Sequence, residues 1–578
     1  MAPLKLPKRG KGKAKQTHID FSSIDSARAS APQGWTRDDW LQGEDSGAEG
    51  DRQDEKGTRY QAGSKAARHF ANATVCYRLA ASLSPSDFDA RYNAARAYQT
   101  LATDHTPPPG CVAALETARD GYREALAVLV RGQEGAATAR IDALFNLAQA
   151  DVAMFEMLEE GVVSESGEEE RKAQLAKEAR DLFVEVERLQ RIEMDSFFGQ
   201  GGLANADDDA DTADESASVA SGAETSVQAI QTTIVTPQLV IDTLLESIAF
   251  YISLHDSSLS SNPDTQAQLR QSALDSFARA IALRSALPGD NPELDFELAY
   301  VKATLLATFS PAEATPFLTH LLASSPFPRI DLLSLYADHL LDSLSLSNPL
   351  PTSLQTLQTA LQTYEQAFSL LSNRLAPPKH IPAHHLPSLV SANLASRAQA
   401  HLLAYTLIQR AHAIDPTTTE AEVPLAQGEE HLHLAHSRAL EASSASKSGL
   451  ALAVSTSAAS QSGPSTKPPL TIGRSPSTVE PRTDWRTLSS LRNALFILVR
   501  VRLRMDASAE RWAAERARFW GLWKALGLSR GAQGESEATV RRREVRWWIE
   551  EIEGDKVAEF VGEEEARRER EWWEGLVA

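Results

Sequence analysis

Residues 73–98 read ATVCYRLAASLSPSDFDARYNAARAY, and this stretch decides the fold class. Its first half carries small and aromatic residues at helical spacing, namely Ala73, Tyr77 and Ala80. Pro85 then ends that helix, because proline lacks an N–H and clashes with the preceding turn. A second helix follows at once over 89–102. Two antiparallel helices approach closely where small residues face each other, so the stretch predicts a helical hairpin.

Similar amphipathic segments extend in both directions from this hairpin. The sequence predicts early helices at 65–83, 89–102, 112–130, 141–159 and 170–191. Helical signals resume at residue 236 and continue to about 443, interrupted by prolines. Short helices joined by turns pack as antiparallel neighbours, so we predict an all-α fold.

The small–aromatic–small pattern recurs along the chain. Its positions are Ala118, Tyr122 and Ala125; Ala179, Phe183 and Val186; Ala273, Phe277 and Ala280; Ala360, Tyr364 and Ala367; and Ala404, Ile408, Ala411 and Pro416. The segment DALFNLAQA at 142–150 also repeats the pattern of 89–98. On these residues the chain resembles the tetratricopeptide repeat (TPR) superfamily, as a divergent member. The resemblance implies a TPR-like helical-repeat solenoid, with insertions that lengthen the family period of about 34 residues.

Composition shifts divide the chain into six predicted regions. We expect a disordered tail at 1–56, basic and then acidic, and TPR-like helices at 57–195. An acidic disordered insertion is expected at 196–234, and a second TPR-like block at 235–442. A Ser/Pro-rich linker at 443–482 leads to a Trp- and Arg-rich helical C-terminal region at 483–578.

The net charge of −20 makes nucleic acid an unexpected partner, because polyanions repel an acidic body. The two cysteines, Cys76 and Cys111, exclude a disulfide scaffold and are typical of a reducing compartment. No run of 18 apolar residues and no secretory signal is visible, so we expect no membrane association. The expected location is intracellular, in the cytoplasm, the nucleus or both. A possible nuclear localisation signal comprises Lys8, Arg9, Lys11, Lys13 and Lys15.

The TPR resemblance implies a groove lined by the first helix of each pair. The groove candidates are Tyr92, Asn93, Arg96, Phe145, Asn146 and Gln149. Chaperone-cofactor members of the family bind a C-terminal carboxylate through Lys and Asn, and Asn93 and Asn146 match the Asn position. Asp89 and Asp142 stand where the Lys residues would be, and they would repel a carboxylate.

Two further clusters have alternative interpretations. Eight of the ten tryptophans lie after residue 482, and they form either a helical cap of the repeat array or an aromatic surface that binds a partner. The histidines at 431, 433 and 436 are interpreted as solvated surface side chains rather than as a zinc site.

No catalytic signature fits its required context. Gly527 and Gly531 complete a G-x-S-x-G match, but the pattern before it is helical, whereas a nucleophile elbow follows a strand. We therefore expect a non-enzymatic protein-interaction scaffold or adaptor, without a cofactor or a metal, that binds a partner peptide or helix. The alternative is an acidic assembly chaperone for a basic client such as a ribosomal protein or a histone. Neither the partner nor the oligomeric state is specified by the sequence.

Overall fold

The computed structural model describes residues 23, 25–26, 44–60, 63–106, 110–129, 136–161, 167–199, 235–260, 262–325, 329–372, 386–417, 423–459, 485–505, 513, 516–517, 519–520, 523, 536–554 and 556–577. Within these residues every regular element is a helix and none is a strand, so the predicted all-α class is confirmed. The five residues of the possible nuclear signal and residues 200–234 of the acidic insertion lie outside the described residues.

The N-terminal helices agree closely with the expected ones and add one more. They are α3 (Glu44–Tyr60), α4 (Gly63–Leu83), α5 (Phe88–Thr100), the π-helix η1 (Leu101–His105), α6 (Gly110–Val128), α7 (Ala136–Glu159) and α8 (Glu168–Gly199). Asp87 caps α5, because its side chain accepts a hydrogen bond from the Ala90 N–H. The expected boundaries of α4 to α7 lie within a few residues of the observed ones, whereas α8 continues to Gly199.

The middle helices follow the prolines that punctuate the sequence. They are α9 (Pro237–Asp256), the 3-10 turn η2 (Ser258–Ser260), α10 (Pro263–Ala286), α11 (Pro292–Phe309), α12 (Pro311–Ser324), α13 (Ile330–Asp342), α14 (Leu350–Leu371), α15 (Leu386–Ile414) and α17 (Leu425–Ala459). Several begin with a proline after a capping side chain, as at Thr236, Asn262 and Asn291. Proline suits the first turn because its missing N–H has no partner there.

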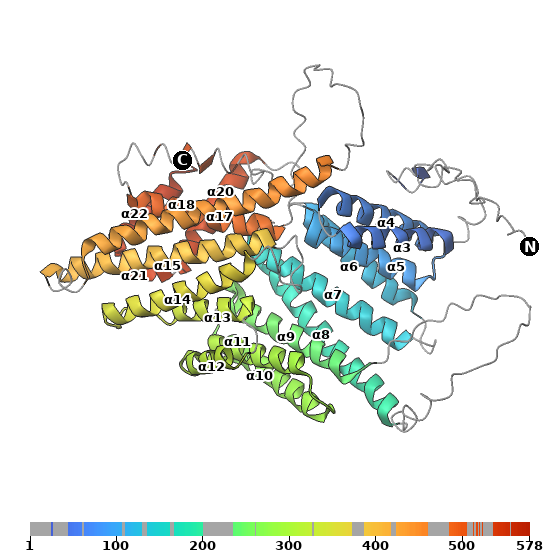
Figure 1. The fold of residues 1–578 in the computed structure, drawn as a ribbon. Helices are drawn as coiled ribbons and strands as arrows, with labels where there is room; N and C mark the ends of the chain where they lie inside the picture. Colours follow the sequence, from blue (N-terminus) through green and yellow to red (C-terminus); the bar gives the residue numbers. More distant parts are fainter. Residues whose placement is uncertain are drawn as a thin grey trace, which may run out of the picture.

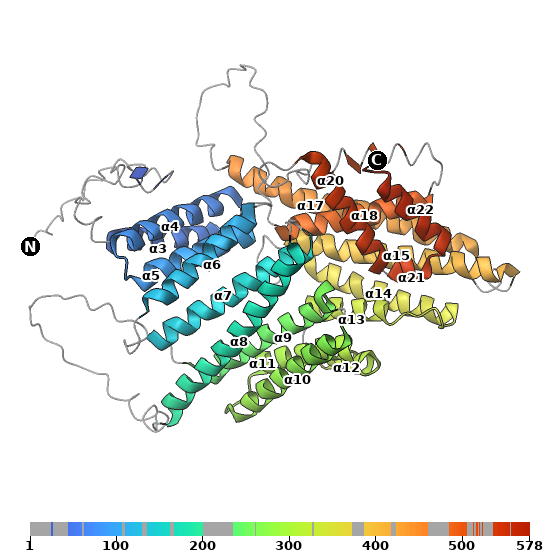
Figure 2. The ribbon, with the colours of Figure 1, turned by 180° about the vertical axis from the view of Figure 1, so that it is seen from behind.

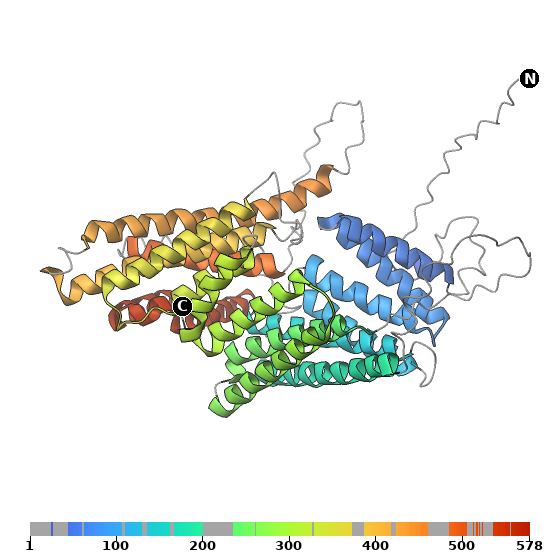
Figure 3. The ribbon, with the colours of Figure 1, turned by 60° about the horizontal axis from the view of Figure 1, so that its bottom comes forward.

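The helices lie side by side in chain order (Figures 1 and 2). Each packs mainly on the helices before and after it, as in the pairs α3–α4, α5–α6 and α7–α8. The blue N-terminal helices therefore lead through the green ones to the yellow and orange ones in Figure 1. Helix α17 also returns to contact α4, which Figure 3 shows from below. Helices that are far apart in the chain order thus contact each other.

The small–aromatic–small positions lie mostly in the core. Ala73, Tyr77 and Ala80 on α4 are buried, and so are the corresponding triads of α6, α8 and α14. The triad of α10 is buried at both alanines, with Phe277 partly buried. The last pattern, beginning at Ala404, falls on α15, which is the first helix of its pair with α17. The pattern therefore predicts which residues are buried, but it does not always fall on the second helix of a pair.

The expectation of a disordered tail at 1–56 is wrong for residues 44–56, which belong to α3. This helix has few apolar residues and docks on α4 through its glycines. The ring of Tyr77 lies where a Cβ of Gly50 would stand, at 2.6 Å, and the ring of Phe70 lies 2.9 Å from the corresponding point of Gly57. Because Gly50 and Gly57 have no side chains, the two aromatic rings of α4 pack directly against the backbone of α3. These contacts compensate for the lack of large apolar side chains on α3.

The expected linker at 443–482 is also wrong at its start, because α17 continues to Ala459. Ser443 is buried within this helix. A serine- and alanine-rich composition suggested a linker, but alanine has the highest helix propensity of all residues. Residues 460–484 lie outside the described residues.

The C-terminal helices are α18 (Trp485–Met505), α20 (Glu537–Gly554), α21 (Lys556–Phe560) and α22 (Glu563–Glu574). They share one core with α15 and α17, and four tryptophans in it are fully buried: Trp523, Trp548, Trp572 and Trp573. The ring of Phe496 stacks on that of Trp548 with centroids 4.5 Å apart. These four rings have no exposed area for a partner, so the alternative of a tryptophan docking surface is wrong for them.

Helix α9 is the one described helix that is long and apolar enough to cross a membrane. It is a core helix here, because it packs between α8 and α10 and buries one apolar face against them, while the opposite face stays accessible to solvent. Among the buried residues are Ile241, Phe250 and Leu254. Its apolar composition is therefore accounted for by its position inside the protein.

The interpretation of His431 as a solvated side chain is wrong. Its Nδ1 lies 3.0 Å from Nδ1 of the buried His401 on α15, so the two rings share one hydrogen bond. His433 is exposed, as expected. Among the described residues no group of three His, Cys, Asp or Glu side chains is placed to hold a metal.

Candidate functional site

The structure brings the predicted groove residues onto neighbouring helices. Asn146 on α7 donates a hydrogen bond from Nδ2 to the hydroxyl of Tyr92 on α5, over 2.8 Å. Arg96 pairs with Asp54 on α3 at 2.7 Å. The ring of Phe145 points instead to Phe183 on α8, at 6.1 Å between centroids. Asn93 and Gln149 are half-buried on α5 and α7. These six residues remain candidates for a partner contact.

Helix α3 contributes carboxylates that sequence reasoning did not assign to this surface. Asp51 accepts a hydrogen bond from the Tyr77 hydroxyl at 2.8 Å, and Asp54 binds Arg96. We call the surface formed by α3, α5, α7, α9, α11 and α13 the odd-helix face. The sequence held no clear signal for this surface, because α5 carries a single acidic residue, Asp89, whereas α8, which is not part of the surface, carries nine.

Protein atoms partly surround carboxylates of α3, α5 and α7. Burial raises the pKa of Asp54, and Asp51 raises it further, although Arg96 opposes this. Burial likewise raises the pKa of Asp89 and of Asp142. Asp89 and Asp142 nevertheless remain exposed to solvent. These two carboxylates are therefore accessible to a partner while part of each side chain is shielded from water.

The acidic surface continues onto α9, α11 and α13. Each of α9 and α13 carries three acidic residues and no Lys or Arg. Burial and the charge of Asp242 raise the pKa of Glu246 on the next turn of α9. The pKa of Glu297 on α11 is raised as well, mainly by burial and to a lesser extent by the negative charge of Asp242. Carboxylates on neighbouring helices therefore repel one another, and a cation placed among them would relieve this repulsion.

At the C-terminal end of α7 the acidic surface meets α18. Burial raises the pKa of Glu156, against the opposing charge of Arg486 on α18. Glu160 is also half-buried, and Ser489 donates a hydrogen bond to it. Arg492 donates from Nη1 to the backbone oxygen of Glu160 at 2.8 Å. Helix α18 thereby connects the C-terminal core to the N-terminal helices.

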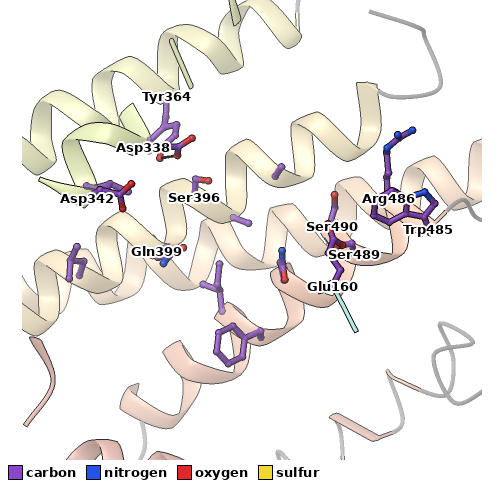
Figure 4. A pocket seen from close by; sticks show the side chains of 17 residues that line it. Glu160, Asp338, Asp342, Tyr364, Ser396, Gln399, Trp485, Arg486, Ser489 and Ser490 are labelled. Carbon is purple, nitrogen blue, oxygen red and sulfur yellow. Dashed lines mark hydrogen bonds between the residues drawn. The ribbon is translucent and has the colours of Figure 1, made fainter. Parts of the chain in front are cut away.

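A chamber of about 850 Å³ lies between α13, α15 and α18 (Figure 4). Its polar lining combines carboxylates with hydroxyl and amide groups, and Arg486 is the one Lys or Arg among its described lining residues. The polar side chains are Glu160, Asp338, Asp342, Tyr364, Ser396, Gln399, Arg486, Ser489, Ser490 and Asn493. Aliphatic and aromatic side chains, including Phe496 and Trp485, form the remaining wall.

Asp338 is the most perturbed carboxylate of the chamber. It is exposed to the chamber, but protein atoms surround it on the other sides, and this burial raises its pKa to about 6. The buried Tyr364 donates a hydrogen bond to it, which favours the ionised form, whereas the nearby Asp342 disfavours that form. The carboxylate is thus held in place and lacks a cationic partner among the described lining residues.

The two cysteines are poorly suited to act as nucleophiles. Cys76 and Cys111 are buried and free, and burial raises the pKa of each thiol to about 12. A thiol of this kind is a poor nucleophile, because the thiolate is the reactive form. Ser529 of the G-x-S-x-G match lies outside the described residues.

No protein-family model and no curated protein matches this sequence. The resemblance to TPR proteins therefore stays a prediction that rests on the residue pattern.

Proposed function

We propose that this protein is a non-enzymatic interaction protein whose odd-helix face binds a basic segment of another protein. The observation that carries the proposal is the row of solvent-exposed carboxylates on these helices, from Asp89 on α5 and Asp142 on α7 to Asp338 on α13, whose pKa values are raised by partial burial. An extended basic segment would lower the pKa of each carboxylate that it contacts, so its binding would be favourable.

The arrangement of the helices supports a TPR-like repeat protein. Consecutive helices pair with one another, and four of the small–aromatic–small triads are fully buried where the pairs meet. A row of helix pairs presents one helix of each pair on an extended surface, and such surfaces are used to bind partners. In such a repeat protein, the odd-numbered helices would occupy equivalent positions in successive repeats.

The charge of the odd-helix face favours a role as an escort for a basic client over a role as a general peptide adaptor. The groove candidates Tyr92, Asn93 and Asn146 are uncharged, and Arg96 is already paired with Asp54. The charges available to a partner on this face are therefore mainly negative. A client rich in Lys and Arg, such as a ribosomal protein or a histone, fits this chemistry.

The proposal is tested by affinity capture from a native extract with matched charge variants. One bait carries Asp142→Asn and Asp242→Asn on the odd-helix face. The control bait carries Asp181→Asn and Asp275→Asn, which lie exposed on α8 and α10. Circular dichroism confirms that each variant is folded, and mass spectrometry identifies the captured proteins over a salt series.

We expect wild type and control to retain the same basic protein at low salt and to release it at high salt. The face variant should retain several-fold less. Equal retention by all three baits would place the contact elsewhere, and a captured partner that is acidic or insensitive to salt would contradict the proposal.

A further inference from the structure

We infer that α3 is a detachable strap, and that the surface of α4 beneath it binds a partner helix with the features of α3. These features are two glycines seven residues apart, with an amide and a carboxylate at adjacent positions between them. The chain's own α3 occupies this surface in the structure and therefore competes with a partner. We call the surface the strap seat, and it comprises His69, Phe70, Asn72 and Tyr77 on α4 and Arg96 on α5.

The two aromatic rings of the strap seat require glycine on the bound helix. The Tyr77 ring lies 2.6 Å from the point where a Cβ of Gly50 would stand, and the Phe70 ring lies 2.9 Å from that of Gly57. A methyl group at either position would force the ring to move, which is costly in a packed interface. Residues seven apart lie on the same face of a helix, so one bound helix can present both glycines to the two rings.

Polar groups of the strap seat contact the side chains between the two glycines. Oε1 of Gln53 lies 2.7 Å from Nδ1 of His69, and it accepts a hydrogen bond from Nδ2 of Asn72 over 3.4 Å. Arg96 donates from Nη2 to Asp54 over 2.7 Å. The seat thus favours an amide and a carboxylate next to each other, and a helix that lacks them would leave these donors without their present partners.

The contacts of α3 predict that it opens more readily than the helices behind it. It packs mainly on α4 (Figure 1), and its buried side chains are the polar Ser46, Glu49 and Gln53. Water can replace most of the hydrogen bonds that α3 loses on opening, so each contributes little net stability. Helix α4 would still pack on α5, η1 and α17. Elements with few buried apolar contacts open locally while the rest of a protein stays folded.

Cys76 reports whether the strap seat is covered. It is buried, and it shares a face of α4 with His69 and Asn72, because residues four and seven apart lie on one side of a helix. Burial raises the pKa of this thiol, and the charge of Glu49 on α3 raises it further. Opening of α3 should therefore expose Cys76, whereas Cys111 on α6 is buried in a different core.

The first experiment measures how often α3 opens in the full chain. Iodoacetamide alkylates exposed thiols, and mass spectrometry of proteolytic peptides quantifies Cys76 and Cys111 separately in one sample. Cys111 thus serves as an internal control for global unfolding. We expect Cys76 to react at least tenfold faster than Cys111 in wild type. Equal rates for the two thiols would mean that α3 opens only when the whole protein unfolds, and would overturn the strap.

Two charge variants test the contact with Arg96. Asp54→Asn removes the charge that pairs with Arg96 on another helix, whereas the control Glu55→Gln removes a charge whose pair with Arg59 lies within α3. We expect alkylation of Cys76 to be about threefold faster in Asp54→Asn and unchanged in the control. Equal rates in the two variants would exclude the carboxylate from the features that the strap seat recognises.

The second experiment supplies the helix as a separate peptide. The full chain with Gly50→Val should have a vacant strap seat, and circular dichroism confirms that it is folded. The probe is a fluorescein-labelled peptide of residues 44–60, and the matched probe is the same peptide with Gly50→Val. Fluorescence anisotropy gives the affinity of each peptide for the variant chain and for wild type. If the variant does not fold, Asp54→Asn takes its place as the chain with the weakened strap.

We expect the unsubstituted peptide to bind the variant chain at least tenfold more tightly than wild type, where α3 already occupies the strap seat. The substituted peptide should bind the variant chain at least tenfold more weakly than the unsubstituted one. Binding should also slow the alkylation of Cys76, which would place the peptide on the seat. Equal affinity of the two peptides, equal affinity for the two chains, or binding that leaves Cys76 reactive would each overturn the inference.

Discussion

The ring of Tyr77 on α4 occupies the space that a side chain of Gly50 on α3 would fill. A Cβ at Gly50 would lie 2.6 Å from Cε1 of the ring, which is far inside van der Waals contact. The same tyrosine donates its hydroxyl to Asp51, so one side chain both packs against α3 and orients a carboxylate of the odd-helix face.

Gly50→Val should therefore detach α3 from α4. Overpacking at a close contact costs about 1–3 kcal/mol, and α3 has few apolar residues to compensate for it. Hydrogen exchange of residues 44–60 should accelerate, while exchange in α6 and α7 stays as in wild type. Gly47→Ala is the matched control, because no atom lies within 4 Å of its Cβ position. Equal exchange rates in both variants would contradict the close packing of α3.

Helix α3, by contrast with its neighbours, could not be predicted from the sequence. The helices from α4 to α7 were predictable, because buried positions such as Ala73 and Tyr77 repeat with the helical period. In α3 the buried positions are Ser46, Glu49, Gly50, Gln53 and Gly57, so no large apolar side chain repeats with the helical period. Its docking depends on two glycines and on hydrogen bonds to residues about twenty positions away, which only the folded chain brings together.

Part of the candidate site could be predicted from the sequence, because that part follows the repeat pattern. Tyr92 and Asn146 were assigned to one groove from the repeat pattern, and they do contact each other. The chamber was not foreseen, since it joins Glu160, Asp338 and Arg486 from three distant segments. Pairing over such distances leaves no local pattern in a single sequence.

Trp573→Ala should destabilise the C-terminal core strongly. Trp573 is fully buried and lies 5.5 Å from the Trp548 ring and 4.8 Å from the Trp572 ring. Truncation of a buried tryptophan costs about 3–5 kcal/mol, measured as the free energy of unfolding in urea. Val577→Ala, at a side chain that is 40% exposed, should change it by less than about 0.5 kcal/mol. A small effect at Trp573 would restore the tryptophans as candidates for a binding surface.

Glu569→Gln should be costly because it removes the one buried carboxylate that Arg500 and Arg504 share. Glu569 binds Nε of Arg500 at 2.6 Å and Nη2 of Arg504 at 3.0 Å, and both arginine side chains are almost fully buried. Burial acts to raise the pKa of Glu569, but the two arginines hold it below its usual value.

Loss of one member of a buried ion pair costs about 3–5 kcal/mol. The measurement is again urea unfolding, with Glu571→Gln as the control, since Glu571 forms an exposed pair with Arg567 one turn away. Similar unfolding free energies for the two variants would show that the buried carboxylate does not stabilise the C-terminal helices.

The His401–His431 pair should make stability depend on pH. Burial, with the charges of His431 and Arg397, lowers the pKa of His401 to about 3. A lowered folded-state pKa means that the neutral ring contributes stability above the unfolded pKa of about 6.5. This contribution falls as pH drops from 6.5 towards 3, and between pH 6.5 and pH 5.5 the loss is about 1 kcal/mol.

His401→Gln keeps a hydrogen-bonding partner for His431 but takes up no proton. Its free energy of unfolding should therefore decline less steeply than that of wild type between pH 6.5 and 4.5. Exposed His433 provides the control, because His433→Gln should leave the wild-type slope unchanged. Parallel curves for all three proteins would show that the buried pair is not the titrating element.

The bond between Arg492 and the backbone of Glu160 spans 332 residues of sequence. During synthesis, α7 and its neighbours leave the ribosome long before α18 exists, and adjacent helices form pairs quickly because their contacts are local. At about 5–20 residues per second, roughly 17–66 s separate the two sides of this contact. During that interval α9, α11 and α13 are added beside α3, α5 and α7 while α18 is still absent, so the acidic face is complete before the C-terminal helices can close against it.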